Sequence, residues 1–138
     1  MECNLCNIKN EEYRIIKKTK HSICCVNLEP IIEGHVMIIP INHKKSYSEF
    51  TPEEAQDFLN LIEESSRILR KAYMKQGALT IVNHGVNQSQ EHIHLHIMPV
   101  NEKEGTRDIL CNFFNVPYRQ KAEVEQLTNI KKHIIKFN

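Results

Sequence analysis

The chain has 138 residues, a length that suits one globular domain able to bury a core without disulfides. Its 18 basic and 17 acidic residues nearly cancel, which gives no electrostatic argument for binding DNA, RNA or an anionic membrane surface. No apolar run approaches the roughly 20 residues needed to span a bilayer, and the N-terminus lacks the basic and apolar regions of a secretory signal, so we expect a cytoplasmic protein.

The first half of the chain predicts short antiparallel strands. Residues 13–18 and residues 22–28 are the predicted strands, separated by a turn near Lys20, and Glu29-Pro30 ends the second. After Gly34, residues 35–40 are rich in β-branched and apolar side chains, and we expect a third strand there.

A long helix is predicted after Thr51. Thr51 can cap the first free backbone N–H groups, Pro52 suits the first helical position, and Glu54 completes a capping box. Gly77 is the expected stop. Apolar residues at helical spacing define the buried face: Ala55, Phe58, Leu59, Ile62, Leu69, Ala72 and Tyr73.

The second half predicts two strands and a last helix. Residues 79–82 and 92–100 are the strands, with turn material between them. A helix fits residues 122–137, in which apolar residues share a face. Antiparallel strands with one long central helix and a C-terminal helix indicate an α+β domain.

The run His92-Ile93-His94-Leu95-His96 is the strongest chemical signal. In a strand, residues two apart share a face at a spacing of about 6.5 Å, so the three histidines project together. They do not help the strand to fold, because buried imidazoles are costly unless each finds a partner. Three interpretations stand: a histidine-rich polar face, a metal site, or covalent catalysis by an imidazole that is neutral near pH 7.

The cysteines give a second signal. Five is an odd number, and a reducing compartment argues against a disulfide framework. Cys3 and Cys6 form a C-x-x-C pair, which indicates zinc but requires two further ligands. The alternatives are two surface thiols, or a redox pair, which the absence of a surrounding βαβ pattern disfavours.

Taken together, these motifs resemble the histidine triad (HIT) superfamily, with its Hint-like and Fhit-like branches. Residues 92–97 are similar to the family's His-x-His-x-His-apolar signature, and residues 34–40 followed by His43 are similar to a second family block. The resemblance covers about residues 1–100 and implies a HIT-like fold. Residues 101–138 would be a C-terminal extension packed on the same domain.

The resemblance also implies roles for particular residues. His94 would be the nucleophile that attacks the α-phosphorus of a nucleotide, with its other nitrogen held by a backbone carbonyl. His96 would contact the phosphate and the leaving group, His35 would pack against the triad and tune it, and Asn27 would bind the ribose hydroxyls. Further contacts would come from Asn83, Gln88 and Ser89 at the phosphates and from Leu5, Ile8 and Leu28 at the base. As turn and core residues, all of these except Gln88 also have a purely structural interpretation.

The resemblance completes the metal site as well. Cys3, Cys6, His43 and His92 would form a closed, structural Cys2His2 zinc site. Two departures from the family pattern weaken other assignments. Val86-Asn87 stands where small residues usually precede the glutamine, and Cys25 stands where an aromatic residue often lies near the base.

The implied function is therefore a hydrolase or transferase that acts on a nucleoside 5′-phosphoryl compound and releases a nucleoside monophosphate. A nucleoside phosphoramidate and a dinucleoside polyphosphate are both possible substrates, a purine base is favoured by analogy, and phosphate could replace water as the acceptor. The alternatives are a nucleotide-binding protein without turnover and a zinc-stabilised interaction module. The family also implies a homodimer.

Overall fold

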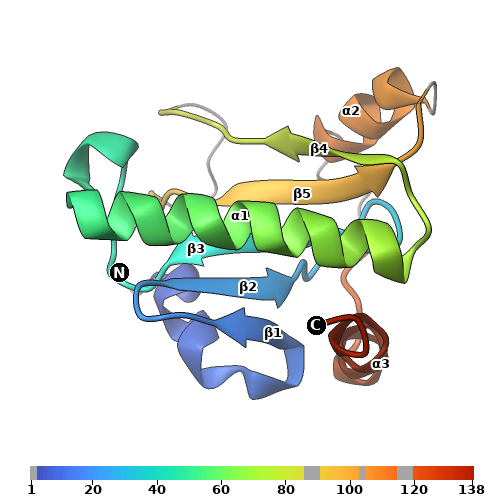
Figure 1. Cartoon of the computed structure of the whole chain (residues 1–138), viewed down its shortest axis with the longest axis horizontal. Coiled ribbons are helices and arrows are strands. Elements are labelled where there is room, and N and C mark those ends of the chain that lie inside the picture. The colour runs from blue at the N-terminus through green and yellow to red at the C-terminus, as the bar shows by residue number, and fades with distance from the viewer. Residues whose placement is uncertain (1–2, 86–90, 103–104, 115–119) are drawn as a thin grey trace.

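The computed structural model describes residues 3–85, 91–102, 105–114 and 120–138. The proposed phosphate contacts Gln88 and Ser89 lie outside these residues. Five strands form one antiparallel sheet in the order β1-β2-β3-β5-β4 (Figure 1). The strands are β1 (Ile15–Lys18), β2 (Ser22–Val26), β3 (Val36–Pro40), β4 (Gly77–Ile81) and β5 (Leu95–Val100). The α+β expectation is thus confirmed.

One face of the sheet is covered by the long helix α1 (Pro52–Ala72) (Figure 1). Alternation along the strands sends one set of side chains toward α1, where Val26, Ile38 and Ile97 pack against Phe58 and Ile68. The other set points to the opposite face. That face carries His35 and His96 and is covered in part by the 3-10 helix η1 (Asn4–Asn10).

The start of α1 is as predicted, but its end is not. The Thr51 hydroxyl accepts from the backbone N–H of Glu54, and the Glu54 carboxylate accepts from the backbone N–H of Thr51, which confirms the capping box. The helix stops at Ala72, and Met74 takes the left-handed conformation, with φ 52°. Hydrogen bonds from Lys75 N to Arg70 O and from Met74 N to Lys71 O form a Schellman motif that ends the helix. Gly77 is therefore not the helix stop and is instead the first residue of β4.

The helical periodicity also misplaced one residue. Leu59 is 59% exposed, whereas Leu61 and Ile68 are buried. The apolar spacing alone did not resolve which side of the apolar stripe faces the sheet.

Several further boundaries differ from the sequence prediction, and β2, β3 and β4 each differ from their predicted ranges by one or two residues at one or both ends. The first strand begins at Ile15, because residues Glu12–Arg14 form the 3-10 helix η2. The predicted strand over residues 92–100 begins only at Leu95, because β3 pairs with β5 no earlier than that residue. The last helix, α3, spans Val124–Ile135 and is capped by Glu123 and Gln126.

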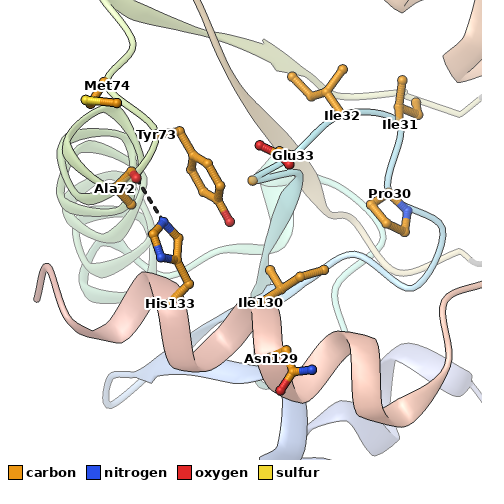
Figure 2. Close-up of a pocket in the computed structure, with 11 residues that line it drawn as sticks. Pro30, Ile31, Ile32, Glu33, Ala72, Tyr73, Met74, Asn129, Ile130 and His133 are labelled. Carbon is orange, nitrogen blue, oxygen red and sulfur yellow. Dashed lines mark hydrogen bonds between the residues drawn. The ribbon is translucent and has the colours of Figure 1, made fainter.

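α3 lies across the C-terminal end of α1. His133 Nε2 donates to the carbonyl oxygen of Ala72 at 2.9 Å, and its ring packs edge-on against Tyr73 (Figure 2). These residues line a cavity of about 740 Å³ that also borders the β2–β3 loop at Glu33 and Gly34. Gly34 has φ +86°, and an added Cβ would lie 2.7 Å from the Tyr73 ring, so both the backbone and the packing require glycine here.

Helix α2 (Thr106–Phe114) was not predicted. It covers part of the face opposite α1, where Ile109 and Phe113 pack with Met98. Its apolar residues at positions 109, 110 and 113 follow helical spacing, but the surrounding polar residues concealed the pattern. No helix in the described part of the chain has the length and apolar character needed to cross a membrane.

Candidate functional site

The β2–β3 loop positions two of the site residues. Val26 and Val36 form the last pair of the β2–β3 ladder, so Asn27 and His35 stand opposite each other just beyond it. Asn27 N donates to His35 O at 3.0 Å, which holds the two residues together. Both side chains are buried, with 6% and 1% exposed.

His96 joins this pair from β5. It lies opposite Met37 of β3. His35 precedes Met37 by two residues, so the side chains of His35 and His96 point to the same face of the sheet. His35 Nε2 and His96 Nδ1 are 2.9 Å apart, and Asn27 Nδ2 lies within 3.1 Å of both nitrogens. The structure therefore brings together three of the residues that the sequence singled out.

His94 lies beside this cluster, with its ring centroid 5.0 Å from that of His96. Its Nδ1 is 2.8 Å from the carbonyl oxygen of His92. A carbonyl only accepts, so Nδ1 carries the proton and Nε2 keeps its lone pair. Burial lowers the pKa of His94, which favours the neutral, nucleophilic ring near pH 7.

The segment before β5 separates His92 from the other two histidines. Ile93 is fully buried, and its N–H donates to the carbonyl oxygen of Lys44 at 2.7 Å. This bond ties the segment to the loop after β3. It places His92 beside His43, with ring centroids 4.8 Å apart, and not in line with His94 and His96 on a regular strand.

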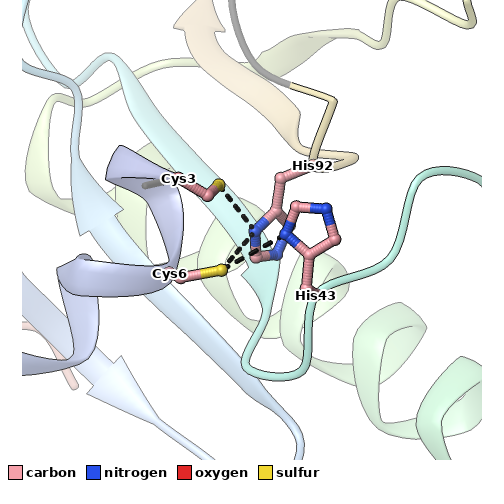
Figure 3. Close-up of side chains that lie close together, drawn as sticks. All are labelled: Cys3, Cys6, His43 and His92. Carbon is pink, nitrogen blue, oxygen red and sulfur yellow. Dashed lines mark hydrogen bonds between the residues drawn. The ribbon is translucent and has the colours of Figure 1, made fainter. Parts of the chain in front are cut away.

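His92, His43, Cys3 and Cys6 form a compact cluster that could hold a metal ion (Figure 3). All four ligand atoms lie within 4.8 Å of one another. Cys6 Sγ is 3.3 Å from His43 Nδ1, and both Cys3 Sγ and Cys6 Sγ are 3.5 Å from His92 Nδ1. Tetrahedral zinc with ordinary bond lengths separates sulfur and nitrogen ligands by about 3.6 Å, so these side chains fit the ion.

The surroundings of the cluster suit metal binding too. His92 Nε2 donates to the carbonyl oxygen of Pro40 at 2.9 Å, which leaves Nδ1 as the ligand atom. Burial lowers the pKa of His92 and so favours the neutral ring that a metal requires. Burial, with the nearby Cys3 thiol adding to it, raises the pKa of the Cys6 thiol, and a divalent cation would reverse that effect by stabilising the thiolate.

The remaining predicted contacts are more dispersed. Leu5 packs beside Ile8 and Cys25 on the site face, whereas Leu28 packs against the α1-side core and lines a separate cavity of about 400 Å³. Asn83 follows β4, in which Ile81 lies opposite His96, so it stands at the end of the sheet that carries His94.

One contact of the site escaped the sequence analysis. Phe113 of α2 is 5% exposed, and its ring stands edge-on to His96, with centroids 4.7 Å apart. The helical spacing of the apolar residues near it was the available signal. Nothing in the sequence indicated which histidine the ring would meet.

The fold and the site together define a class: a small α+β domain with adjoining histidines on the face of its sheet opposite α1 and a Cys2His2 cluster beside them. The family model for the HIT domain matches residues 9–103, and the chain belongs to this family.

Two curated relatives and one solved structure illustrate the similarity. The chain is 30% identical over 88 residues to the asymmetrical bis(5′-nucleosyl)-tetraphosphatase of Schizosaccharomyces pombe, a match that covers 62% of this chain and 48% of that one. It is 28% identical over 100 residues to the bis(5′-adenosyl)-triphosphatase of Saccharomyces cerevisiae, covering 70% and 48% respectively. The chain thus spans about half the length of these relatives.

A Zn-bound histidine triad family protein from Mycobacterium smegmatis shares the fold. Its TM-score is 0.70 at 20% identity, and the match covers 99% of this chain and 94% of that one.

Proposed function

We propose that this protein is a nucleotide hydrolase that attacks the α-phosphate of a nucleoside 5′-phosphoryl substrate and releases a nucleoside monophosphate. The observation that carries the proposal is the hydrogen bond from His94 Nδ1 to His92 O, which leaves the lone pair on Nε2. Membership of the HIT family supports it, as do the names of the two relatives.

The proposed reaction has two steps. The Nε2 lone pair of His94 forms a bond to the α-phosphorus, and the bond from phosphorus to the leaving group breaks. The leaving group takes a proton from a site donor, and His96, whose ring centroid is 5.0 Å from that of His94, is the proposed one. Water then attacks the nucleotidyl-histidine and returns a proton to the site donor, the phosphorus–nitrogen bond breaks, and the nucleoside monophosphate leaves with His94 restored.

The substrate is proposed to be a dinucleoside polyphosphate or a nucleoside phosphoramidate. The relatives named as tetraphosphatase and triphosphatase favour the first. Purine is the proposed base, with Leu5 among the residues near it. Asn83, Gln88 and Ser89 remain proposed phosphate contacts.

Zinc is the proposed occupant of the Cys3, Cys6, His43 and His92 cluster. The four donors match its tetrahedral preference, and a closed Cys2His2 set leaves no position for a substrate, so its role would be structural. The Zn-bound relative lends support by analogy.

A homodimer is also proposed. β4 is an edge strand that pairs on one side only within the described part of the chain, which leaves its outer edge available to a second copy. Light scattering across a concentration series tests this, and a monomeric mass throughout would contradict it.

A substrate panel with wild type and His94→Ala tests the proposed activity. We expect wild type to release AMP from diadenosine tetraphosphate or an adenosine phosphoramidate, and His94→Ala to lose on the order of 1,000-fold or more. Nucleotide binding without turnover by wild type would favour a non-catalytic binding protein. Zinc content with neither binding nor turnover would favour an interaction module.

A further inference from the structure

Glu54 is buried at the start of α1, and its carboxylate has more partners than a helix cap needs. Its side chain is 6% exposed, and Oε1 accepts from the backbone N–H of Thr51 at 3.0 Å. The same oxygen lies 3.2 Å from Lys44 Nζ, and Oε2 accepts from Asn42 Nδ2 at 3.4 Å. The capping box accounts for the bond to Thr51 only, so the other two bonds need a separate explanation.

Asn42 and Lys44 are the two neighbours of His43 in the loop after β3. The carboxylate of Glu54 therefore bonds this loop on both sides of a residue of the Cys2His2 cluster. His43 is itself exposed, so its side chain gains little from packing. Its position depends instead on how firmly the backbone on either side is held.

Lys44 also connects His43 to the second histidine of the cluster. The Lys44 carbonyl oxygen accepts from the N–H of Ile93 at 2.7 Å, and Ile93 directly follows His92. His43 and His92 come from segments far apart in the chain, yet their ring centroids are 4.8 Å apart (Figure 3). Lys44 is thus bonded covalently to one histidine of the pair and through a hydrogen bond to the neighbour of the other.

The ammonium group of Lys44 needs the carboxylate of Glu54 to stay where it is. The Lys44 side chain is 18% exposed, and its Nζ also donates to the neutral carbonyl oxygen of Glu49 at 3.0 Å. A charge that is largely removed from water is strongly disfavoured when its opposite charge is removed. Loss of the Glu54 charge should therefore let the ammonium turn outward to water and loosen the loop that carries His43.

We propose that Glu54 is a positioning residue that holds His43 and His92 beside each other through Lys44. The bond to Thr51 stabilises the start of α1, whereas the bonds to Asn42 and Lys44 fix the loop of the Cys2His2 cluster to that helix. The consequence for zinc rests on the proposed function of the cluster, whereas the positioning of the two histidines does not.

Glu54→Gln is the test variant, because it keeps the length of the side chain and an oxygen for Thr51 N but loses the charge that holds Lys44. Thr51→Ala is the matched control. It removes the hydroxyl that accepts from Glu54 N and so weakens the same helix start, but it leaves the carboxylate and its bonds to the loop in place. A purely structural role of Glu54 predicts that the two variants behave alike.

The first measurement is amide hydrogen exchange at Ile93, followed by NMR. We expect the Ile93 N–H to exchange about tenfold faster in Glu54→Gln than in Thr51→Ala, because local opening of the loop releases its bond to Lys44 O. Equal exchange rates at Ile93 in the two variants would overturn the proposal, because the effect of Glu54 would then be only that of a helix cap.

The second measurement is zinc affinity by competition with a chelator. We expect the Kd for zinc to be about tenfold higher in Glu54→Gln than in wild type and Thr51→Ala, at the lower end of what the loss of a group that orients a metal ligand costs. Equal affinity in all three proteins would overturn the proposal. If wild type binds no zinc, the proposed occupant fails, and exchange at Ile93 still decides whether Glu54 positions the histidines.

Lys44→Met tests the route through Lys44, because it keeps the apolar stem and removes the ammonium. We expect the double variant Glu54→Gln/Lys44→Met to exchange at Ile93 about as fast as Lys44→Met alone, since the second substitution removes a bond that the first has already broken. Fully additive effects of the two substitutions would overturn the proposal, because Glu54 would then act independently of Lys44.

Discussion

His94 Nδ1 lies 2.8 Å from the carbonyl oxygen of His92, and the imidazole of the same His92 belongs to the Cys2His2 cluster. The backbone of a metal-cluster residue therefore orients the ring proposed to be the nucleophile, while its side chain is held by Pro40 O and the two thiols. A substitution that disrupts the Cys2His2 cluster should therefore alter the position of His94 through His92.

This link predicts that Cys6→Ala and His94→Ala have different effects on zinc content, although both should reduce activity. We expect wild type and His94→Ala to bind one zinc per chain by atomic emission, and Cys6→Ala to bind much less. Cys6→Ala should also lose activity, by about 100-fold, because His94 is no longer held in place. Equal zinc in all three proteins, or none in wild type, would contradict the account.

Phe113 should contribute to both stability and activity, although it lies outside the sequence motifs of the site. Phe113→Ala removes a buried ring that contacts His96, and we expect a loss of about 3 kcal/mol in the free energy of unfolding and a fall of about tenfold in kcat. Leu110→Ala on the same helix is the control, because Leu110 is 36% exposed and should cost under about 1 kcal/mol. Chemical denaturation with steady-state kinetics measures both effects, and equal effects of the two substitutions would refute this role.

Gly34 is expected to tolerate no side chain. Gly34→Ala combines a strained φ of +86° with a Cβ 2.7 Å from Tyr73 and 2.8 Å from Pro99, and we expect it to cost about 2–3 kcal/mol. In Gly77→Ala the new Cβ meets nothing within 4 Å, so that protein should be about as stable as wild type. Thermal unfolding of the two variants checks this. A Gly34→Ala protein as stable as Gly77→Ala would contradict the close contact of Gly34 with Tyr73 and Pro99.

Glu54 should make stability depend on acid pH. The backbone N–H of Thr51 lowers its pKa to about 2, helped by Lys44 and opposed by burial. A carboxyl whose pKa is lowered on folding stabilises the protein above its unfolded value of about 4.5, and the benefit disappears as the pH falls toward 2. Glu54→Gln should therefore cost about 1–2 kcal/mol at pH 7 and nothing near pH 2.

The control for this substitution is Glu53→Gln. Glu53 is also in the first turn of α1, but its side chain is 79% exposed and its nearest partner, His21, is 3.8 Å away. It should change stability little at either pH. If the gap between Glu54→Gln and wild type in urea unfolding did not narrow at acid pH, the ionised capping box would not be the cause.

The predictable parts of this protein are those with local chemical signals. The start of α1 could be predicted from Thr51, Pro52 and Glu54, because helix capping depends on residues only a few positions apart. The metal cluster could be predicted from sequence because the family resemblance adds two histidines to the C-x-x-C pair. The structure places all four residues together: Cys3, Cys6, His43 and His92.

The parts that sequence reasoning missed depend on long-range packing. The separation of His92 from a regular strand follows from the bond between Ile93 N and Lys44 O, which joins segments far apart in the chain. The orientation of the Asn27 side chain depends on the loop N–H of Glu29, and that of the His35 ring depends on the loop N–H of Ile31. Spacing along the sequence carries no information about either contact.

The most direct test of the central claim is to trap the intermediate on His94. Wild type is mixed with diadenosine tetraphosphate, quenched within the first turnover at alkaline pH, where phosphoramidates survive, and digested for peptide mass spectrometry. The account predicts an adenylyl group on His94 that appears and decays with turnover and is absent from His94→Ala. Full turnover by His94→Ala, or an adenylyl group that follows turnover on another residue, would contradict it.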